Sequence, residues 1–108
     1  MDKIQFIGMD EIKDDLEKST IDKITNEYYG KIQDALREFT GIVIHLKQHS
    51  KGGKKKWDIR IRVNAPSKMF EAQESDWDLA RTLHKVFQNL EREIEHKMKV
   101  SEHRLKHV

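Results

Sequence analysis

The stretch IVIHLKQHSKGGKKKWDIRIRV, residues 42–63, decides the fold class of this chain. Apolar side chains recur at every second position on both sides of the glycine pair Gly52 and Gly53. Such alternation is typical of strands that bury one face, and glycines supply the backbone conformations of a turn. The stretch therefore predicts a β-hairpin, with strands over residues 42–49 and 57–63 and a loop over residues 50–56.

The segments before the hairpin predict a strand and a helix. Residues 3–8 are a strand candidate, and the acidic residues 9–19 fit a turn or a short helical segment. From about Thr20 the apolar side chains recur every three or four residues, which is the period of an amphipathic helix. We expect Gly41 to end this helix as a C-terminal cap. The apolar stripe consists of Ile21, Ile24, Tyr28, Ile32, Ala35 and Phe39.

After the hairpin the sequence predicts one more strand and a long helix. Residues 68–74 form the strand candidate, and the helix runs from about Asp76 to at least Lys99, with Ser75 or Asp76 as its N-terminal cap. The predicted order is β-α-β-β-β-α. This order predicts an α+β fold, a four-stranded, mostly antiparallel sheet with both helices on one face. The apolar stripe of the last helix is Leu79, Leu83, Val86, Phe87, Leu90, Ile94 and Met98.

Length and composition limit the class of protein. A chain of 108 residues is one ordinary domain, and we expect residues 1–108 to form it, with about 100–108 as a frayed tail. The chain has no cysteine, no apolar run long enough to span a membrane and no signal-peptide pattern at its start. We therefore expect a cytoplasmic monomer without disulfides.

The charges of the chain are unevenly distributed. Residues 1–41 carry six Lys/Arg against ten Asp/Glu, a net −4, whereas residues 42–108 carry fifteen against nine, a net +6. At helical spacing, several basic side chains of the last helix share one side, opposite the apolar stripe. A sorted cationic side suggests contacts with regularly spaced phosphates, although a solvated face can be sorted by chance. These residues are Arg81, Lys85, Arg92, His96, Lys99, His103 and Lys106.

A second basic cluster lies in and after the hairpin loop. Lys54, Lys55 and Lys56 follow the glycines, and Arg60 and Arg62 lie on the polar side of the next strand. Lysines bind phosphate as point charges, and arginines can bind it in a bidentate manner. The alternative is that the lysines only solubilise the loop or protect a sheet edge.

The sequence offers little support for a catalytic or metal site. His96, His103 and His107 share a helical face, but lysines and an arginine surround them and no cysteine accompanies them. The acidic residues near Asp78 fit the positive end of a helix dipole, and no phosphate loop or nucleophile motif is present. We expect no enzyme activity, no metal, no cofactor and no small-molecule substrate. Trp77 falls off the apolar stripe, so we expect it either to cover an edge of the fold or to contact a partner.

The stretch FEAQESDWDLARTLHKVFQNLEREIEHKMK, residues 70–99, resembles the ribosome hibernation-promoting factors, which include the ribosome-associated translation inhibitors. That family has a last strand with an alanine, an acidic turn, and a long helix ending in a Leu-x-Arg-x-apolar segment before His/Lys residues. The chain departs from the family at Ala80, where a tyrosine is common, and it is short. A divergent short form of the family, with an archaeal source as one alternative, would explain both departures. The matching residues are Ala72, Asp78, Leu90, Arg92, Ile94, His96, Lys97 and Lys99.

The resemblance implies binding to the small ribosomal subunit, in the channel that mRNA and tRNA use. Family members block translation and protect idle ribosomes under stress, and the implied rRNA contacts here are Arg92, Lys97 and Lys99. Two alternatives stay open. One is a general structured-RNA binder, because the expected fold is like that of double-stranded-RNA-binding domains. The other is a protein-interaction module that uses the long last helix.

Overall fold

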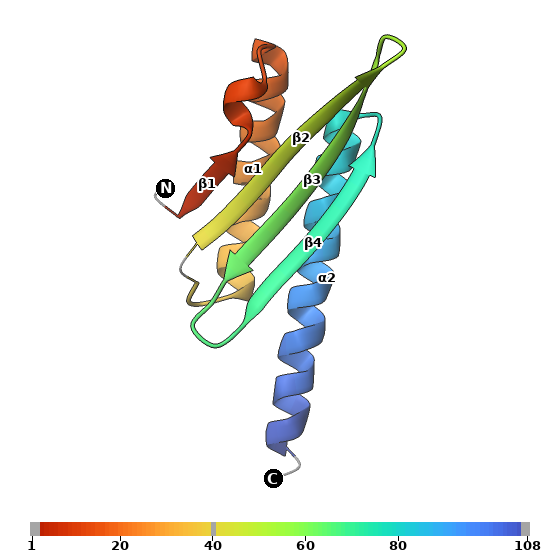
Figure 1. The fold of residues 1–108 in the computed structure, drawn as a ribbon. Helices are drawn as coiled ribbons and strands as arrows, with labels where there is room; N and C mark the ends of the chain where they lie inside the picture. The colour runs from red at the N-terminus through yellow and green to blue at the C-terminus, as the bar shows by residue number, and fades with distance from the viewer. Residues whose placement is uncertain (1–2, 40, 107–108) are drawn as a thin grey trace.

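The computed structural model describes residues 3–39 and 41–106, and the side chains of the last helix up to Met98. The element order confirms the predicted β-α-β-β-β-α arrangement and the α+β class (Figure 1). The elements are β1 (Ile4–Ile7), a 3-10 turn (Met9–Glu11), α1 (Asp15–Ala35), β2 (Gly41–Lys51), β3 (Lys54–Asn64), β4 (Met69–Asp76) and α2 (Leu79–Lys106).

The four strands form one sheet in the order β1-β2-β3-β4. β1 pairs with β2 in parallel, and the other two pairings are antiparallel, so the sheet is mostly antiparallel as predicted. Both helices lie on the same side of the sheet (Figure 1). The opposite side of the sheet, which we call the sheet face, is therefore not covered by a helix.

The core lies between the helices and the sheet. Ile44 pairs with Ile61 across β2 and β3, and both side chains are fully buried, which confirms the inward positions predicted from alternation. Between the helices, the rings of Tyr28 and Phe87 stack with their centroids 4.8 Å apart. The Tyr28 hydroxyl also lies 3.0 Å from Nδ1 of His84 in α2. These contacts fix α1 against α2.

The turn of the hairpin is shorter than the sequence predicted. Lys51 pairs with Lys54, so only Gly52 and Gly53 connect β2 to β3. Their φ angles are 59° and 79°, and positive φ at both central positions is what a two-residue type I′ turn requires. The predicted loop over residues 50–56 is therefore wrong, because the glycine pair lets the strand ladder continue to the tip.

The first helix begins five residues before the predicted Thr20. Its N-terminal cap is Asp14, whose Oδ1 accepts hydrogen bonds from the backbone N–H groups of Leu16 at 2.8 Å and Glu17 at 3.1 Å. A capping carboxylate satisfies N–H groups that have no partner inside the helix. Of the two alternatives for the acidic residues 9–19, a turn or a short helical segment, both occur: Met9–Glu11 form the 3-10 turn, and the residues from Asp15 onward form the first turn of α1.

The same helix ends earlier than predicted. It stops at Ala35, and the extended Leu36 bonds back to the carbonyl of Ile32 at 2.8 Å. Phe39 lies beyond the helix yet is only 5% exposed, so its place in the apolar period reflects a buried loop residue. Gly41 is the first residue of β2 and not the helix cap, so that prediction is wrong.

The start of the second helix also differs from the prediction. Oδ1 of Asp78 accepts a hydrogen bond from the Arg81 N–H at 2.8 Å, which makes Asp78 the cap. Ser75 and Asp76, the predicted caps, belong to β4. Within the described residues, no helix is long and apolar enough to cross a membrane.

Candidate nucleic-acid interface

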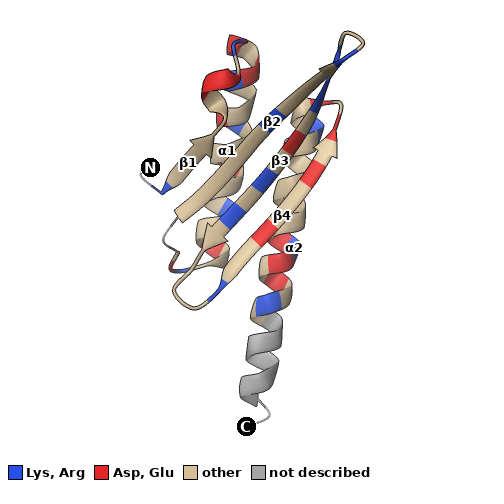
Figure 2. Ribbon diagram, viewed as in Figure 1, with Lys and Arg blue, Asp and Glu red and all other residues tan. Residues whose placement is uncertain are grey.

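The structure separates the predicted phosphate-binding residues into two surfaces. One is the sheet face, and the other is the side of α2 that points away from the core, which we call the ridge. Figure 2 shows the basic residues of β3 on the sheet in front of α2. The sheet face carries Lys54, Lys56, Arg60 and Arg62, and the ridge carries Arg81, Lys85, Arg92 and His96.

Alternation along β3 places its arginines on the sheet face. Because Ile59, Ile61 and Val63 are fully buried on the helix side, Arg60 and Arg62 between them face the other way. The two guanidinium groups have different surroundings, which decides how available each is to a ligand.

Arg62 is already paired, whereas Arg60 is not. Nη2 of Arg62 lies 3.1 Å from Oε2 of Glu71 on β4, its cross-strand neighbour. Arg60 lies between His45 and Gln73, and within the described residues it has no ion pair. It lines a hollow of about 550 Å³ on the sheet face. Arg60 is therefore the arginine of this face that can bind a phosphate without first breaking an ion pair.

The hairpin tip concentrates positive charge on the same face. Alternation and the β2–β3 register place Lys54 and Lys56 beside Lys51 and His49. Lys55 points to the other side, where its Nζ lies 3.2 Å from Oε1 of Glu17 in α1. The three consecutive lysines therefore do not act together, because Lys55 contacts a helix while its neighbours lie on the sheet face.

One carboxylate holds the first two basic residues of the ridge. Oδ2 of Asp76 lies 3.1 Å from Nζ of Lys85, and its Oδ1 lies 3.7 Å from Nη1 of Arg81. The hydrogen bond from the Trp77 backbone N–H, and then the one from Lys85, lower the pKa of the Asp76 carboxyl below its usual value. Arg81 keeps 66% of its side chain exposed, so it is oriented by Asp76 and still accessible.

Sequence reasoning missed this role of Asp76. We assigned Asp76 to the start of the helix, whereas it ends β4 and points toward the helix side of the sheet. Its nine-residue separation from Lys85 is not a helical spacing, so only the strand-to-helix geometry shows the contact. The alternation of β4, with Phe70 buried and Ala72 half-buried, was the one signal that places Asp76 on that side.

The remaining ridge residues lie farther along α2. Arg92 and His96 are exposed, and Nη1 of Arg92 donates a hydrogen bond to Oδ1 of Asn89 at 3.2 Å. Among the described residues Arg92 has no ion pair, and a hydrogen bond to a neutral amide does not neutralise its charge. The side chain of Lys99, the next predicted contact, lies outside the described residues, as does that of His103.

Lys97 does not lie on the ridge. Its Nζ donates to the backbone oxygen of Met69 at 3.0 Å and lies 5.6 Å from the ring centroid of Phe70. Glu93, one helical turn earlier, accepts the Glu71 backbone N–H at 2.9 Å. Together these side chains satisfy free backbone groups of the edge strand β4, so Lys97 has a structural role in the isolated protein.

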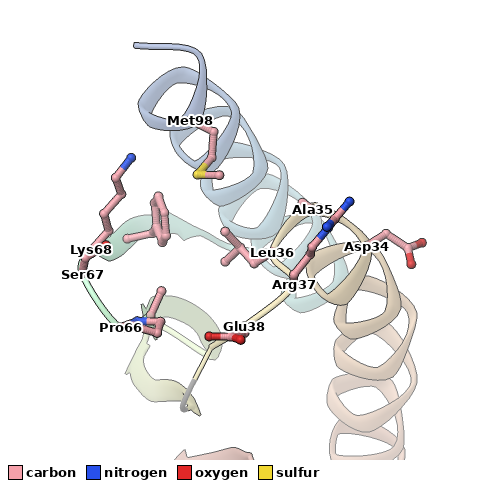
Figure 3. Close-up of a pocket in the computed structure, with 11 residues that line it drawn as sticks. Asp34, Ala35, Leu36, Arg37, Glu38, Pro66, Ser67, Lys68 and Met98 are labelled. Carbon is pink, nitrogen blue, oxygen red and sulfur yellow. The ribbon is translucent and has the colours of Figure 1, made fainter. Parts of the chain in front are cut away.

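The structure has a second hollow, which lies away from both basic surfaces. A second hollow of about 600 Å³ lies where the end of α1 and the β3–β4 turn meet α2, with Leu36, Pro66 and Met98 in its wall (Figure 3). It lies away from the hairpin tip, and its wall contains none of the basic residues named for the sheet face or the ridge.

The histidines and acidic residues are also potential metal ligands. Among the described residues, no three histidine or acidic side chains are grouped to hold a metal ion, and His107 lies outside the described residues.

Comparison with known proteins identifies the fold. A ribosomal subunit interface protein from Coxiella burnetii superposes with a TM-score of 0.68 at 20% identity, covering 89% of this chain and 97% of that chain. The N-terminal domain of Thermus thermophilus Protein Y superposes with a TM-score of 0.58 at 16% identity, covering 86% and 92%. The fold is shared. No protein-family model and no curated protein sequence matches the chain.

Proposed function

We propose that this chain binds the small ribosomal subunit through rRNA phosphate contacts and silences translation by occluding the mRNA and tRNA channel. The observation that carries the proposal is the fold shared with the ribosomal subunit interface protein over nearly the whole of both chains. The resemblance of residues 70–99 to the hibernation-promoting factors supports the same function from the sequence. In this role the chain acts by binding and by filling space, and it catalyses no reaction.

The charges with no competing partner are the strongest candidates for rRNA contacts. Arg60 and Lys54 have no ion pair within the described residues, and Arg92 is bonded only to a neutral amide. A phosphate can bind these groups without displacing a carboxylate, so the full charge-assisted hydrogen bond adds to affinity. For Arg62 and Lys55, the ligand must first replace Glu71 or Glu17. We therefore propose Arg60, Lys54 and Arg92 as the main rRNA contacts. Arg62 and Lys55 are supporting contacts.

Co-sedimentation with purified small subunits at moderate and high salt tests the proposal. The sheet-face variant carries Lys54→Glu with Arg60→Glu, and the ridge variant carries Arg81→Glu with Arg92→Glu. A matched control carries Lys23→Glu with Arg37→Glu, two exposed positions outside both surfaces. All three variants have the same net charge, so a difference among them reports the position of the charge and not its amount.

The expected result is salt-sensitive, near-stoichiometric binding by the wild type. Each surface variant should bind at least about tenfold more weakly, and the slope of log affinity against log salt should fall by about one per phosphate contact removed. The control should bind like the wild type. Equal loss in all three variants would contradict the proposed surfaces. No binding by the wild type would contradict the ribosomal function, and preference for free duplex RNA would favour a general structured-RNA binder.

A further inference from the structure

Trp77 is an exposed aromatic residue at the junction of β4 and α2. Its side chain is 52% exposed, whereas Trp57 on β3 is 2% exposed. Among the large exposed hydrophobic residues in the described part of the chain, it is the one aromatic. A half-exposed tryptophan keeps a large apolar area in water, which is unfavourable unless a ligand covers it. The core gives no reason for a tryptophan at this position.

The strand register places this ring at the end of the sheet face. Trp57 pairs with Asp76, so one step further along the same register Trp77 lies across from Lys56. Nζ of Lys56 lies 5.9 Å from the centroid of the Trp77 ring, in agreement with that placement. The ring is therefore the continuation of the cationic surface formed by Lys54, Lys56 and the sheet-face arginines.

The backbone on both sides of Trp77 is held in place. Its own N–H donates to Oδ1 of Asp76 at 2.6 Å, and Asp76 in turn binds Lys85 of α2. On the other side, Asp78 caps the first turn of α2 through the Arg81 N–H. A ring on a fixed backbone loses less conformational freedom when a ligand stacks on it than a ring on a mobile loop.

We propose that Trp77 is a stacking platform for an unpaired RNA base, with Lys56 and Arg81 contacting the adjoining phosphates. Unpaired bases stack on exposed aromatic rings in basic surroundings, and a base paired inside a duplex cannot present its face in this way. The inference rests on the proposed function, and it adds that this end of the surface binds single-stranded nucleotides. The other exposed large hydrophobic residues of the described chain lie on other elements or at the far ends of β4 and α2, so none of them adjoins Trp77 along β4 or α2. They are Ile7 on β1, Leu16 at the start of α1, Met69 at the start of β4 and Met98 at the end of the described part of α2.

Tryptophan fluorescence tests the inference directly. In the variant Trp57→Phe, Trp77 is the one remaining tryptophan, because the chain has two. We expect a short single-stranded oligouridylate to quench its emission, and inorganic polyphosphate, which supplies charge without bases, to leave it unchanged. Because Trp57 is buried and its replacement can impair folding, the same titration is repeated with the wild type and Trp77→Phe. Loss of the quenching in Trp77→Phe assigns the signal to Trp77.

Affinity measurements separate stacking from charge. The anisotropy of a labelled oligouridylate should show about 5- to 150-fold weaker binding by Trp77→Ala than by the wild type, the range for one stacked base. The slope against salt should be unchanged, and Trp77→Phe should retain most of the affinity. Equal quenching by polyphosphate, unchanged affinity in Trp77→Ala, or no binding of the oligouridylate would each overturn the inference.

The two proposals fail in distinguishable ways. Oligouridylate that binds without quenching, together with retained binding to small subunits, removes the stacking role and leaves the proposed function. Quenching that persists when the wild type does not co-sediment with small subunits removes the ribosomal function and leaves an RNA-binding residue.

Discussion

Replacing Phe87 should destabilise the protein more than most single substitutions, because this side chain joins the two helices. Phe87 is fully buried, and its ring stacks almost parallel on Tyr28, at an interplanar angle of 5°. Truncating a buried phenylalanine to alanine costs about 3–5 kcal/mol in protein cores. The stacked pair accounts for about 0.5–1.5 kcal/mol of that cost. Because a domain of this size has a free energy of unfolding of about 5–15 kcal/mol, Phe87→Ala should remove a large part of it.

Urea unfolding, followed by far-UV circular dichroism, measures this cost. The control is Leu16→Ala, a comparable apolar truncation at a side chain that is 79% exposed, and it should change the free energy of unfolding by less than about 0.5 kcal/mol. Combining Phe87→Ala with Tyr28→Ala should show a coupling energy of at least about 0.5 kcal/mol. A cost below about 1.5 kcal/mol for Phe87→Ala, or additive effects of the two substitutions, would refute the packing of α1 on α2 described above.

Two further predictions concern the backbone and the pH dependence. Gly8→Ala should lower the free energy of unfolding by at least about 2 kcal/mol, because Gly8 has a φ of 97° and an added Cβ would collide with a backbone oxygen of β2. The control is Gly30→Ala in α1, where an added Cβ meets open space. This substitution should be neutral or stabilising in the same urea experiment. Asp76 has a lowered pKa in the folded state, so the unfolded chain binds its proton more readily. The stability that Asp76 contributes is therefore present above its unfolded pKa of about 3.8 and lost as pH falls through the lower folded value. Urea midpoints should differ between wild type and Asp76→Asn at pH 6 and converge below pH 4, and a difference that does not change with pH would contradict the ion-pair assignment.

The arrangement of the fold was predictable because it depends on apolar periodicity. The alternation around Gly52 and Gly53 placed the inward faces of β2 and β3 correctly, since burial on one side of a sheet requires a period of two. The helix end was not predictable from the same signal. Phe39 falls at a helical spacing from Ile32 but is buried from a loop, and a period cannot distinguish these two ways of reaching the core. The end of the helix is shown by the backbone hydrogen bond in which the Leu36 N–H donates to the carbonyl of Ile32.

The residue types of the candidate site were predictable from the sequence. Which of its basic side chains form ion pairs with carboxylates of the protein was not predictable. Sequence reasoning treated Lys54, Lys55 and Lys56 as one basic cluster in the hairpin loop, whereas the two-residue turn makes them strand residues that alternate in direction. Which of them then pairs with a carboxylate depends on segments far away in the sequence, such as Glu17 in α1. Tertiary contacts of this kind leave no periodic signal in the sequence. The sequence therefore indicates which residues are charged, but it does not show which of them pair with an opposite charge.

The positions of the uncompensated charges limit how one RNA ligand can contact the protein. The sheet face and the ridge lie on opposite layers of the domain, so a single flat ligand cannot contact both (Figure 2). They approach each other at the junction of β4 and α2, where Lys56 lies over the ring of Trp77 and Asp76 holds Arg81. A ligand that contacts both surfaces must therefore bend around this junction, and a single strand bends there more easily than a duplex. A combined variant with Arg60→Glu and Arg92→Glu should then lose more affinity for a long single strand than for a duplex of equal length.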